Sequence, residues 1–434
     1  MEQKNRMEAE RAVLVGMIRD ADESEACRRS LDELARLLHT AGGEVFATMI
    51  QAKASPDPRT CIGSGKVAEL SALCSANDIS LVVFDMELSP VQIRNLEEDL
   101  GGEVMVIDRT MLILDIFALH AVTGEGKLQV ELAQLRYSAP RLTGQGIHLS
   151  RQGGRIGTRG PGESQLESNR RYIRRRIAAL EQQLEEMQKN RSVMRASRAR
   201  SGIPKIAIVG YTNAGKSTLL NYLTDAGVLS EDKLFATLDP TTRQLRLPCG
   251  ETVLLTDTVG LIRKLPHQLI EAFHSTLEEA ALSDVLLVVA DAADCECAEQ
   301  LTVTLQLLDE LGAAEKEKII VYNKADLIST DLKQERSNGA DISAATDSLM
   351  ISAATGIGVD ALLQRIEEAI RRCRREVQLF FPFDRQAELS SLHRTGRILA
   401  TEYTDGGVAV CAVLDEKERG QYREFLRSDG GGRT

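Results

Sequence analysis

The sequence predicts an α/β protein with a doubly wound, mostly parallel sheet in its central part, a small parallel α/β domain with a helical hairpin before it, and a small α+β domain after it. Three observations support this prediction. The stretch "GYTNAGKST" at residues 210–218 directly follows the apolar run Ile206–Val209. Short apolar runs alternate with amphipathic helical patterns in two separate parts of the chain. Further polar motifs stand directly after apolar runs, where the strands of a parallel sheet end and ligands bind.

Residues 1–107 are expected to form a small parallel α/β domain. The apolar runs that predict its strands are Val13–Ile18, Val45–Ile50, Leu81–Phe84 and Val104–Ile107. Within this region "IGSGK" (Ile62–Lys66) imitates a phosphate loop, but Cys61 stands where the first glycine belongs and Val67 replaces the serine or threonine. A structural loop is therefore favoured over a second nucleotide site.

Residues 108–202 are expected to form an antiparallel helical hairpin. One long helix is predicted over Asp108–Ser138 and a second from Glu163 to about Arg200. The connection between them, "RLTGQGIHLSRQGGRIGTRGPGE", contains seven glycines and four arginines, so its tip should be exposed. The second helix has the 4-3 spacing of a two-helix seam, formed by Leu166, Ile173, Ile177, Leu180, Leu184, Met187 and Met194.

The charge of this hairpin differs from that of the rest of the chain. The whole protein carries a net charge of −11, yet residues 141–200 hold 14 Lys and Arg against 5 Asp and Glu. Such asymmetry indicates a segment that approaches a polyanion. Aromatic residues make up only 4% of the chain, so RNA would be bound through phosphates and shape rather than base stacking. The expected RNA contacts are Arg151, Arg155, Arg159, Arg170, Arg171, Arg174 and Arg175; a solvated linker without function is the alternative.

Residues 203–373 form the predicted P-loop nucleotide-binding domain. The spacing of Gly210, Gly215, Lys216 and Ser217 fits G-x-x-x-x-G-K-[ST] between a strand and a helix. Backbone amides of residues 211–217 should surround the phosphates at the positive end of the following helix. Lys216 would neutralise phosphate oxygens, and the Ser217 hydroxyl would bind Mg²⁺.

Three companion motifs favour a guanine nucleotide. "TDTVG" (Thr256–Gly260) supplies Asp257 near Mg²⁺ and an amide at Gly260 for the γ-phosphate. "YNKAD" (Tyr322–Asp326) supplies a carboxylate that accepts the two donors of guanine, which adenine lacks, and "SAA" (Ser352–Ala354) offers amides to the guanine carbonyl. Each motif follows an apolar run, so GTP and GDP are the expected ligands.

The segment "FATLDPTTR" (Phe235–Arg243) is expected to respond to the γ-phosphate. Thr237 is predicted to give the second Mg²⁺ hydroxyl, with Thr241 and Thr242 as competitors. Leu261 follows Gly260, the predicted sensor of the γ-phosphate, at the position where Ras-type GTPases carry a glutamine. GTP hydrolysis by the protein without a partner should therefore be slow. Asn213 resembles the asparagine of GTPases that use K⁺ beside the phosphates, which makes K⁺ a second hypothetical cofactor.

The predicted site can be stated residue by residue. Lys216, Thr237, Asp257 and Gly260 are the predicted catalytic residues, and Ser217 and Thr237 the predicted metal ligands. The predicted nucleotide contacts are Gly210, Tyr211, Thr212, Asn213, Ala214, Gly215, Lys216, Ser217, Thr218, Phe235, Ala236, Thr237, Leu238, Asp239, Asp257, Thr258, Val259, Gly260, Asn323, Lys324, Ala325, Asp326, Ser352, Ala353 and Ala354.

Residues 374–434 are expected to form the small α+β domain. Its predicted strands are Val377–Phe381, Ile398–Tyr403 and Val408–Val413, the last two joined as a hairpin. No run of about 18 apolar residues and no signal-peptide pattern occurs in the sequence. A cytoplasmic protein without a membrane span is therefore expected. The protein is also expected to be a monomer.

On these motifs the sequence resembles the HflX family of translation-associated GTPases, within the Obg-HflX group. The stretches that carry the resemblance are "IGSGKVAEL", "ELSPVQIRNLE", "GGRIGTRGPGESQLESNRRYIRRRI", "GYTNAGKSTLLN", "FATLDPTTR", "DTVGLIRKLPHQLIEAF", "NKAD" and "SAA". They span nearly the whole chain. One small departure is "GESQLESN", where the family usually has threonine and aspartate at the positions of Ser164 or Ser168 and Asn169.

The resemblance implies a partner that the residues alone leave open. It implies binding to the 50S ribosomal subunit, with the hairpin loop reaching ribosomal RNA near the peptidyl-transferase centre. It also implies action on 70S ribosomes, where the protein promotes subunit dissociation under stress. Two alternatives stay open. One is a GTPase of tRNA modification, although neither Cys373 nor Cys411 is placed like that class's terminal cysteine motif. The other is a GTP-dependent assembly or anti-association factor that does not need hydrolysis to act.

Overall fold

The computed structural model describes most of the chain in twelve segments. These are residues 10–20, 23–141, 161–199, 203–224, 234–235, 241–263, 280–328, 348–373, 375–395, 397–404, 406–414 and 416–426. Two compact units can be distinguished. The first includes the described residues up to Glu185 together with Leu234 and Phe235, and the second includes the others.

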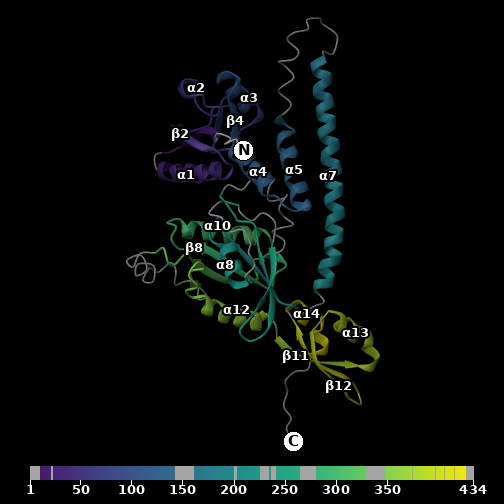
Figure 1. Cartoon of the computed structure of the whole chain (residues 1–434). Helices are drawn as coiled ribbons and strands as arrows, with labels where there is room; N and C mark the ends of the chain where they lie inside the picture. Colours follow the sequence, from purple (N-terminus) through teal and green to yellow (C-terminus); the bar gives the residue numbers. More distant parts are fainter. Residues whose placement is uncertain are drawn as a thin grey trace, which may run out of the picture. The chain divides into compact units, whose positions relative to one another are not determined.

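The first unit contains a four-stranded parallel sheet. Its strands are β1 (Arg11–Ile18), β2 (Glu44–Ala52), β3 (Leu81–Phe84) and β4 (Met105–Asp108), in the order β2-β1-β3-β4. Helices α2 (Ser64–Asn77) and α3 (Pro90–Asp99) pack on one face, while α1 (Ser24–Thr40) and α4 (Arg109–His120) contact the strands and each other (Figure 1). The predicted strands are confirmed to within about two residues. Central strands are buried on both faces, so they read as continuous apolar runs.

A buried ion cluster joins α1 and α4 at the carboxyl edge of this sheet. Arg109, 3% exposed, donates to Asp85 at 2.8 Å and also to Glu33, while the Ser30 hydroxyl donates to Asp85 at 2.6 Å. Burial alone lowers the pKa of Arg109, but the two carboxylates outweigh burial and raise it. Each buried charge is therefore compensated by the others.

Replacing Arg109 with methionine should destabilise the protein strongly, because two carboxylates would stay buried without their cation. The expected loss is about 3–5 kcal/mol in the free energy of unfolding, measured by urea denaturation of the full chain. Arg136→Met is the matched control, because Arg136 forms an exposed pair with Glu181 at 2.8 Å. This substitution should lower the free energy of unfolding by less than about 1 kcal/mol. Equal losses would contradict the interpretation.

The helical segment differs from the prediction in one respect. The single helix expected over Asp108–Ser138 is two helices, α4 and α5 (Gly124–Ser138), so that prediction was wrong. The chain is extended at Ala121, and the Thr123 hydroxyl accepts a hydrogen bond from the Gly126 N–H at 3.0 Å, which caps a new helix. Local side-chain capping thus overrides the helical apolar pattern.

Helix α7 (Pro161–Ala199) packs along α5 as the predicted seam indicates. Leu180 and Leu184 are buried against Leu132, with Ile177 partly buried beside them. Arg176 of α7 also forms a two-pronged ion pair with Glu131 of α5, at 2.7 Å for both contacts. The side chains of Leu166 and Met194 and the glycine-rich connection lie outside the described residues.

The second unit contains a six-stranded sheet in the order β10-β9-β8-β5-β7-β6, in which only β6 runs antiparallel to its neighbour. Its strands are β5 (Lys205–Gly210), β6 (Thr241–Arg246), β7 (Thr252–Asp257), β8 (Val285–Asp291), β9 (Glu317–Asn323) and β10 (Ser348–Met350). Helices α8 (Lys216–Thr224) and α12 (Val359–Cys373) pack on one face and α10 (Cys297–Glu310) on the other (Figure 1). This is the predicted doubly wound, mostly parallel sheet.

A small antiparallel sheet follows, as predicted. Strands β11 (Arg375–Pro382), β12 (Arg397–Thr404) and β13 (Gly407–Leu414) lie in the order β11-β13-β12. Helices α13 (Gln386–Thr395) and α14 (Glu416–Gln421) accompany it, with 3-10 turns at Phe383–Arg385 and Arg423–Phe425. Within the described part of the chain, none of the helices has the length and apolar character needed to span a bilayer.

Candidate nucleotide-binding site

The loop between β5 and α8 can be built only with glycine at two positions. A Cβ atom at Gly210 would lie 2.1 Å from the Val289 carbonyl oxygen, and one at Gly215 would lie 2.2 Å from the Asn323 amide nitrogen. Gly215 has φ +88° and Asn213 has φ +61°, so both adopt the left-handed backbone that glycine and asparagine tolerate. The loop can therefore pass close to the neighbouring strands, and the backbone amides that follow it lie at the start of α8.

Lys216 lies inside this loop rather than in solvent. It is 5% exposed, and its ammonium donates to the Tyr211 carbonyl oxygen at 2.8 Å. Burial lowers the pKa of Lys216 to about 8, an effect that Asp257 partly opposes. A Cβ atom at Gly260 would lie 3.1 Å from the Lys216 ammonium. The cation is thus held beside the sensor glycine, where an added anion would restore its full charge.

Two oxygen donors suited to a hard cation meet next to Lys216. The Ser217 hydroxyl donates to the Asp257 carboxylate at 2.7 Å, and Asp257 is fully buried at the end of β7. Hydroxyl and carboxylate oxygens are the ligands that Mg²⁺ prefers, so this pair fits the ion. The other predicted ligand, Thr237, lies outside the described residues, as do Ala236, Leu238 and Asp239.

Thr241 and Thr242, the two alternatives to Thr237 as the second Mg²⁺ ligand, lie among the described residues. Thr241 begins β6, and the Thr242 hydroxyl lies 3.0 Å from the Thr256 hydroxyl within the β6–β7 pair. The Thr242 hydroxyl is therefore engaged in the sheet.

The sensor motif is tied to the phosphate loop by backbone hydrogen bonds. The Leu261 N–H donates to the Gly210 carbonyl at 3.0 Å, and the Thr212 N–H donates to the Leu261 carbonyl at 2.8 Å. Thr258 fixes the start of the motif, because its hydroxyl donates to the Ile208 carbonyl at 2.7 Å. Leu261 itself is 3% exposed. The Thr212 hydroxyl is buried and has no hydrogen-bond partner among the described residues, which leaves an acceptor or donor for a ligand.

Asn323 connects the phosphate loop to the base motifs. It ends β9, is 2% exposed, and its amide donates to the Ala214 carbonyl at 2.9 Å. Its carbonyl oxygen accepts from the Ala353 N–H, also at 2.9 Å. The Asp326 carboxylate accepts from the Ser352 hydroxyl at 2.6 Å. One buried amide therefore sets the position of both loops.

Three residues that contact predicted site residues, or each other beside the site, were not predicted from the sequence: Asp291, Arg263 and Glu296. Lys324, at φ +62°, forms an ion pair with Asp291 at 2.7 Å, and Asp291 ends β8 as Asn323 ends β9. That parallel could have identified Asp291. The Arg263 N–H donates to the Tyr211 hydroxyl at 2.8 Å, and its guanidinium pairs with Glu296 at 3.1 Å. Nothing in the spacing of these residues indicates that contact.

Phe235, a predicted nucleotide contact, packs against another aromatic ring. It is buried at φ +59°, and its ring meets Phe117 of α4 edge to face with centroids 4.6 Å apart. The aromatic contact accounts for its burial.

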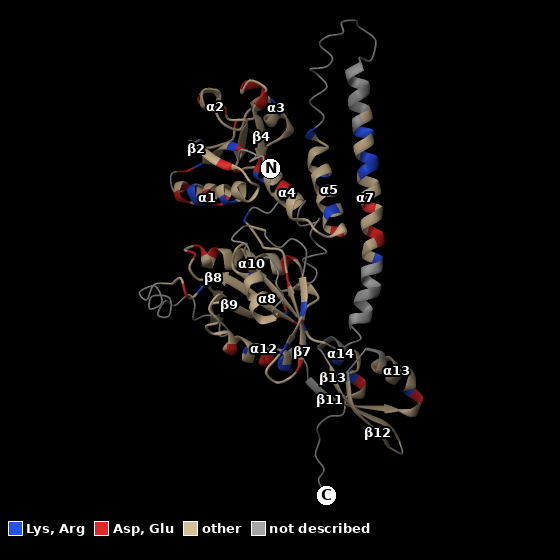
Figure 2. Ribbon diagram, viewed as in Figure 1, with Lys and Arg blue, Asp and Glu red and all other residues tan. Residues whose placement is uncertain are grey.

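The predicted RNA contacts fall into two groups. Arg170, Arg171, Arg174 and Arg175 are exposed, whereas the neighbouring Arg176 forms the ion pair with Glu131. Figure 2 shows Lys and Arg positions in blue along the described part of α7. Arg151, Arg155 and Arg159 lie outside the described residues.

Three family models match the chain in succession. They are described as GTP-binding GTPase N-terminal over residues 28–118, GTP-binding GTPase middle region over 120–198, and 50S ribosome-binding GTPase over 205–324. The sequence-based division into a first α/β part, a helical part and a nucleotide-binding part follows the same order.

Individual relatives match over nearly the whole length. GTPase HflX of Caldanaerobacter subterraneus subsp. tengcongensis is 46% identical over 419 residues, which cover 96% of this chain and 94% of the relative. GTPase HflX of Escherichia coli is 44% identical over 362 residues, 83% of each chain. Among solved structures, a GTP-binding protein from the archaeon Sulfolobus solfataricus in complex with GDP is 27% identical, with coverage of 84% and 99% and a TM-score of 0.44.

Proposed function

The chain belongs to the HflX family of GTPases, and we propose that it is a GTP-dependent switch that acts on ribosomes through the 50S subunit. The observation that carries the nucleotide part is the convergence of Lys216, the Ser217–Asp257 pair and the Asn323 bridge at one end of the six-stranded sheet. Ligands of such sheets bind at the carboxyl ends of the strands.

Each residue has a distinct task in the proposed reaction. Lys216 and the loop amides bind the β- and γ-phosphates, and Asp326 accepts the two donors of guanine. Ser217 and Thr237 would hold Mg²⁺, with Asp257 beside them, and the ion supplies positive charge that stabilises the transferring phosphoryl group. The Gly260 amide senses the γ-phosphate. These tasks are electrostatic and positional, which is what phosphoryl transfer to water requires.

Nothing at position 261 can orient the attacking water, because the side chain is an alkyl group and is buried. The proposed enzyme is therefore slow alone and is completed by its partner. We propose that the GTP form binds the 50S subunit, remodels or splits 70S ribosomes, and is released after hydrolysis. The exposed arginines of α7 support contact with ribosomal RNA. A role under stress belongs to the same proposal.

The test is steady-state GTP hydrolysis with and without purified 50S and 70S particles, over a salt series in potassium buffer. The expected result is a salt-sensitive stimulation of about 10²-fold or more, the scale of a partner that completes a GTPase site. A variant lacking residues 144–160, which lie outside the described part, should keep its intrinsic turnover and lose stimulation. Equal stimulation of both proteins would contradict the role of the hairpin.

A second assay separates the proposal from an assembly or anti-association factor. In a single round of 70S dissociation followed by light scattering, GTP and a non-hydrolysable analogue are compared. Equal extents of dissociation with both would favour a factor in which hydrolysis only resets binding. No effect of either, with no stimulation by ribosomes, would direct the search to another RNA, including tRNA.

The potassium hypothesis makes a separate prediction. Replacing K⁺ by Na⁺ should lower turnover about tenfold, because one positive charge near the phosphates would be lost. Asn213→Gly, which tolerates the same left-handed backbone, should be slow in both cations. An unchanged rate for the unaltered protein in Na⁺ would remove K⁺ from the mechanism.

A further inference from the structure

We propose that a cavity beside strand β4 binds a free apolar amino acid through the charged head group and the side chain of that ligand. The cavity has a volume of about 220 Å³ and is lined by residues of α3, β4, the start of α4 and the end of α5. All of these residues belong to the first compact unit, whereas the phosphate loop belongs to the second. The inference therefore goes beyond the proposed function and does not depend on it.

One face of α3 forms a wall of the cavity. Pro90, Ile93, Arg94 and Glu97 recur at the three- and four-residue spacing of a single helix face. Strand β4, at the edge of the four-stranded sheet (Figure 1), contributes further lining residues. Met105 of β4 is 48% exposed and Ile93 is only partly buried. Apolar surface is therefore available to the side chain of a ligand.

Arg94 and Glu97 carry opposite charges at this cavity without pairing. They stand three positions apart on α3, a spacing at which ion pairs commonly form, yet neither has an ion-pair partner among the described residues. The Arg94 Nε atom is buried and has no hydrogen-bond partner there. Glu97 accepts a long hydrogen bond of 3.4 Å from the Val106 N–H, and burial raises the pKa of its carboxyl group. A ligand with one charge of each sign would compensate both groups.

A second guanidinium group borders the cavity. Arg141 lies over the Tyr137 ring, 3.3 Å from its centroid, and donates to the Leu88 carbonyl at 3.0 Å. Its Nε atom is also buried and lacks a hydrogen-bond partner within the described part of the chain. Asp108 lines the cavity too, but it already accepts from the Met111 N–H and the Tyr137 hydroxyl. The two Nε groups are the donors left for a ligand, and paired guanidinium donors suit a carboxylate.

The balance of charge favours a zwitterion. Two arginines and two carboxylates border the cavity, so its formal charge is zero. A simple anion would be repelled by the carboxylates, and a simple cation would be repelled by the guanidinium groups. An amino acid can place its carboxylate at the arginines and its ammonium at Glu97, while its side chain lies on Ile93 and Met105. The volume is below the roughly 300–1,000 Å³ of sites for drug-sized ligands, which fits so small a molecule.

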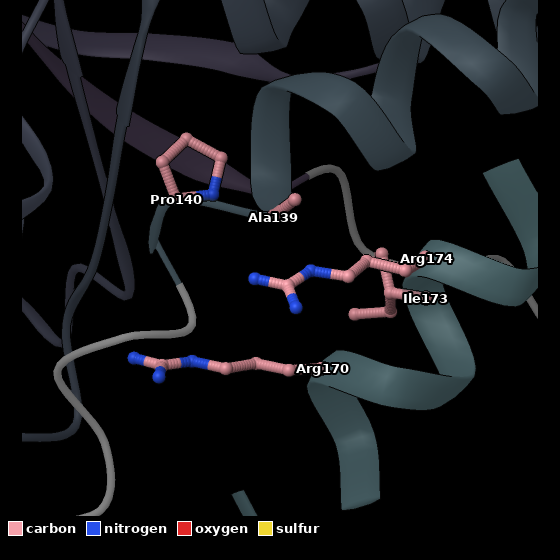
Figure 3. A pocket seen from close by; sticks show the side chains of 5 residues that line it. All are labelled: Ala139, Pro140, Arg170, Ile173 and Arg174. Atoms are coloured by element: carbon pink, nitrogen blue, oxygen red, sulfur yellow. The ribbon is translucent and has the colours of Figure 1, made fainter. Parts of the chain in front are cut away.

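A second pocket of the first unit shows that this balance is specific to the cavity. That pocket lies between the end of α5 and helix α7 and is lined by Ala139, Pro140, Arg170, Ile173 and Arg174 (Figure 3). Its lining contains two arginines and no carboxylate. It therefore offers nothing to an ammonium group and is not a second site for the same ligand.

The test is a ligand-detected NMR titration of the full chain with L-leucine and two analogues that each lack one charge. Isocaproate lacks the ammonium, and isoamylamine lacks the carboxylate. L-leucine should bind with a Kd of roughly 10 µM to 1 mM, as expected of a ligand with few atoms. Each analogue should bind about tenfold more weakly or worse, because a charge-assisted hydrogen bond is lost.

Two variants assign the charges to their residues. Glu97→Gln should weaken L-leucine about tenfold and abolish the preference for L-leucine over isocaproate, because the ammonium loses its partner. Arg94→Gln should abolish the preference for L-leucine over isoamylamine. Glu98→Gln and Arg59→Gln are the matched controls, since both residues are exposed and do not line the cavity. Each control should change the Kd by less than about twofold. Circular dichroism and intrinsic GTP turnover show that the four variants are folded.

The outcomes that overturn the proposal are distinct. If L-leucine, L-methionine and L-phenylalanine all fail to bind the unaltered protein, the cavity is not an amino-acid site. If isocaproate binds at least as well as L-leucine, the ligand is a simple anion and the zwitterion is wrong. Equal losses for all ligands in the cavity variants would show that Arg94 and Glu97 only support the local structure. Ribosome-stimulated GTP turnover of the same preparations decides the proposed function separately.

Discussion

Replacing Lys216 with alanine should lower the affinity for GTP and GDP by about three orders of magnitude, or about 4 kcal/mol. The side chain is almost fully buried beside the Gly260 backbone and donates to the Tyr211 carbonyl. Phosphate oxygens placed in the loop would therefore lose their enclosed cation, in a site where water cannot replace it. Isothermal titration calorimetry with both nucleotides measures the loss.

The look-alike loop of the first unit provides the control. Lys66 stands in "IGSGK", and its ammonium pairs with Glu69 at 2.9 Å, while the Gly63 N–H donates to the Gln51 side chain at 2.8 Å. Lys66→Ala should leave GTP affinity unchanged. Folding of Lys216→Ala is expected to be preserved, because removing a buried ammonium also removes its desolvation cost. Nanomolar GTP binding by Lys216→Ala would refute the assignment of the phosphate loop.

Asp326→Asn should change the preferred base from guanine to xanthine. In the proposed site the carboxylate would accept two donors of guanine, whereas an asparagine amide can donate to the carbonyl that xanthine carries in place of the 2-amino group. A site whose buried donors and acceptors no longer match its ligand typically discriminates by about 10³-fold or more. Competition between GTP and XTP for the variant, followed by fluorescent GDP displacement, measures the reversal.

Ser352→Ala is the matched control for that change. Its hydroxyl donates to Asp326 at 2.6 Å, so its removal loosens the carboxylate without altering what the carboxylate can accept. Weaker binding of both nucleotides with the guanine preference retained is expected. If Asp326→Asn still prefers GTP, another group reads the base.

Much of the fold could be predicted from local patterns in the sequence. β3 is buried along its whole length, and buried parallel strands must be apolar runs, so their positions could be predicted within about two residues. The phosphate loop could be located from its two glycines. Gly210 and Gly215 have to be glycine because neighbouring atoms leave no room for a side chain at either position. The base motifs follow from the same rule, since polar residues at strand ends face the ligand edge.

Other features depend on partners that lie far away in the sequence. The Arg109 cluster joins residues 76 positions apart, and no spacing rule connects them. The separation of Arg176 from Arg170 and Arg174 depends on Glu131 of α5, which only the packed pair of helices brings near. The break before α5 depends on one threonine hydroxyl competing with a continuing helix. The domain boundaries predicted from the sequence stay predictions.

The position of Leu261 has a consequence for timing. Both of its backbone polar groups are bonded to the phosphate loop, and its side chain faces the interior. A glutamine introduced there would therefore be directed into the interior, away from a water molecule at the γ-phosphate. If ribosomes complete the site as proposed, the lifetime of the GTP form is set by how often the protein meets them. The protein would then stay longer in its GTP form when ribosomes are scarce.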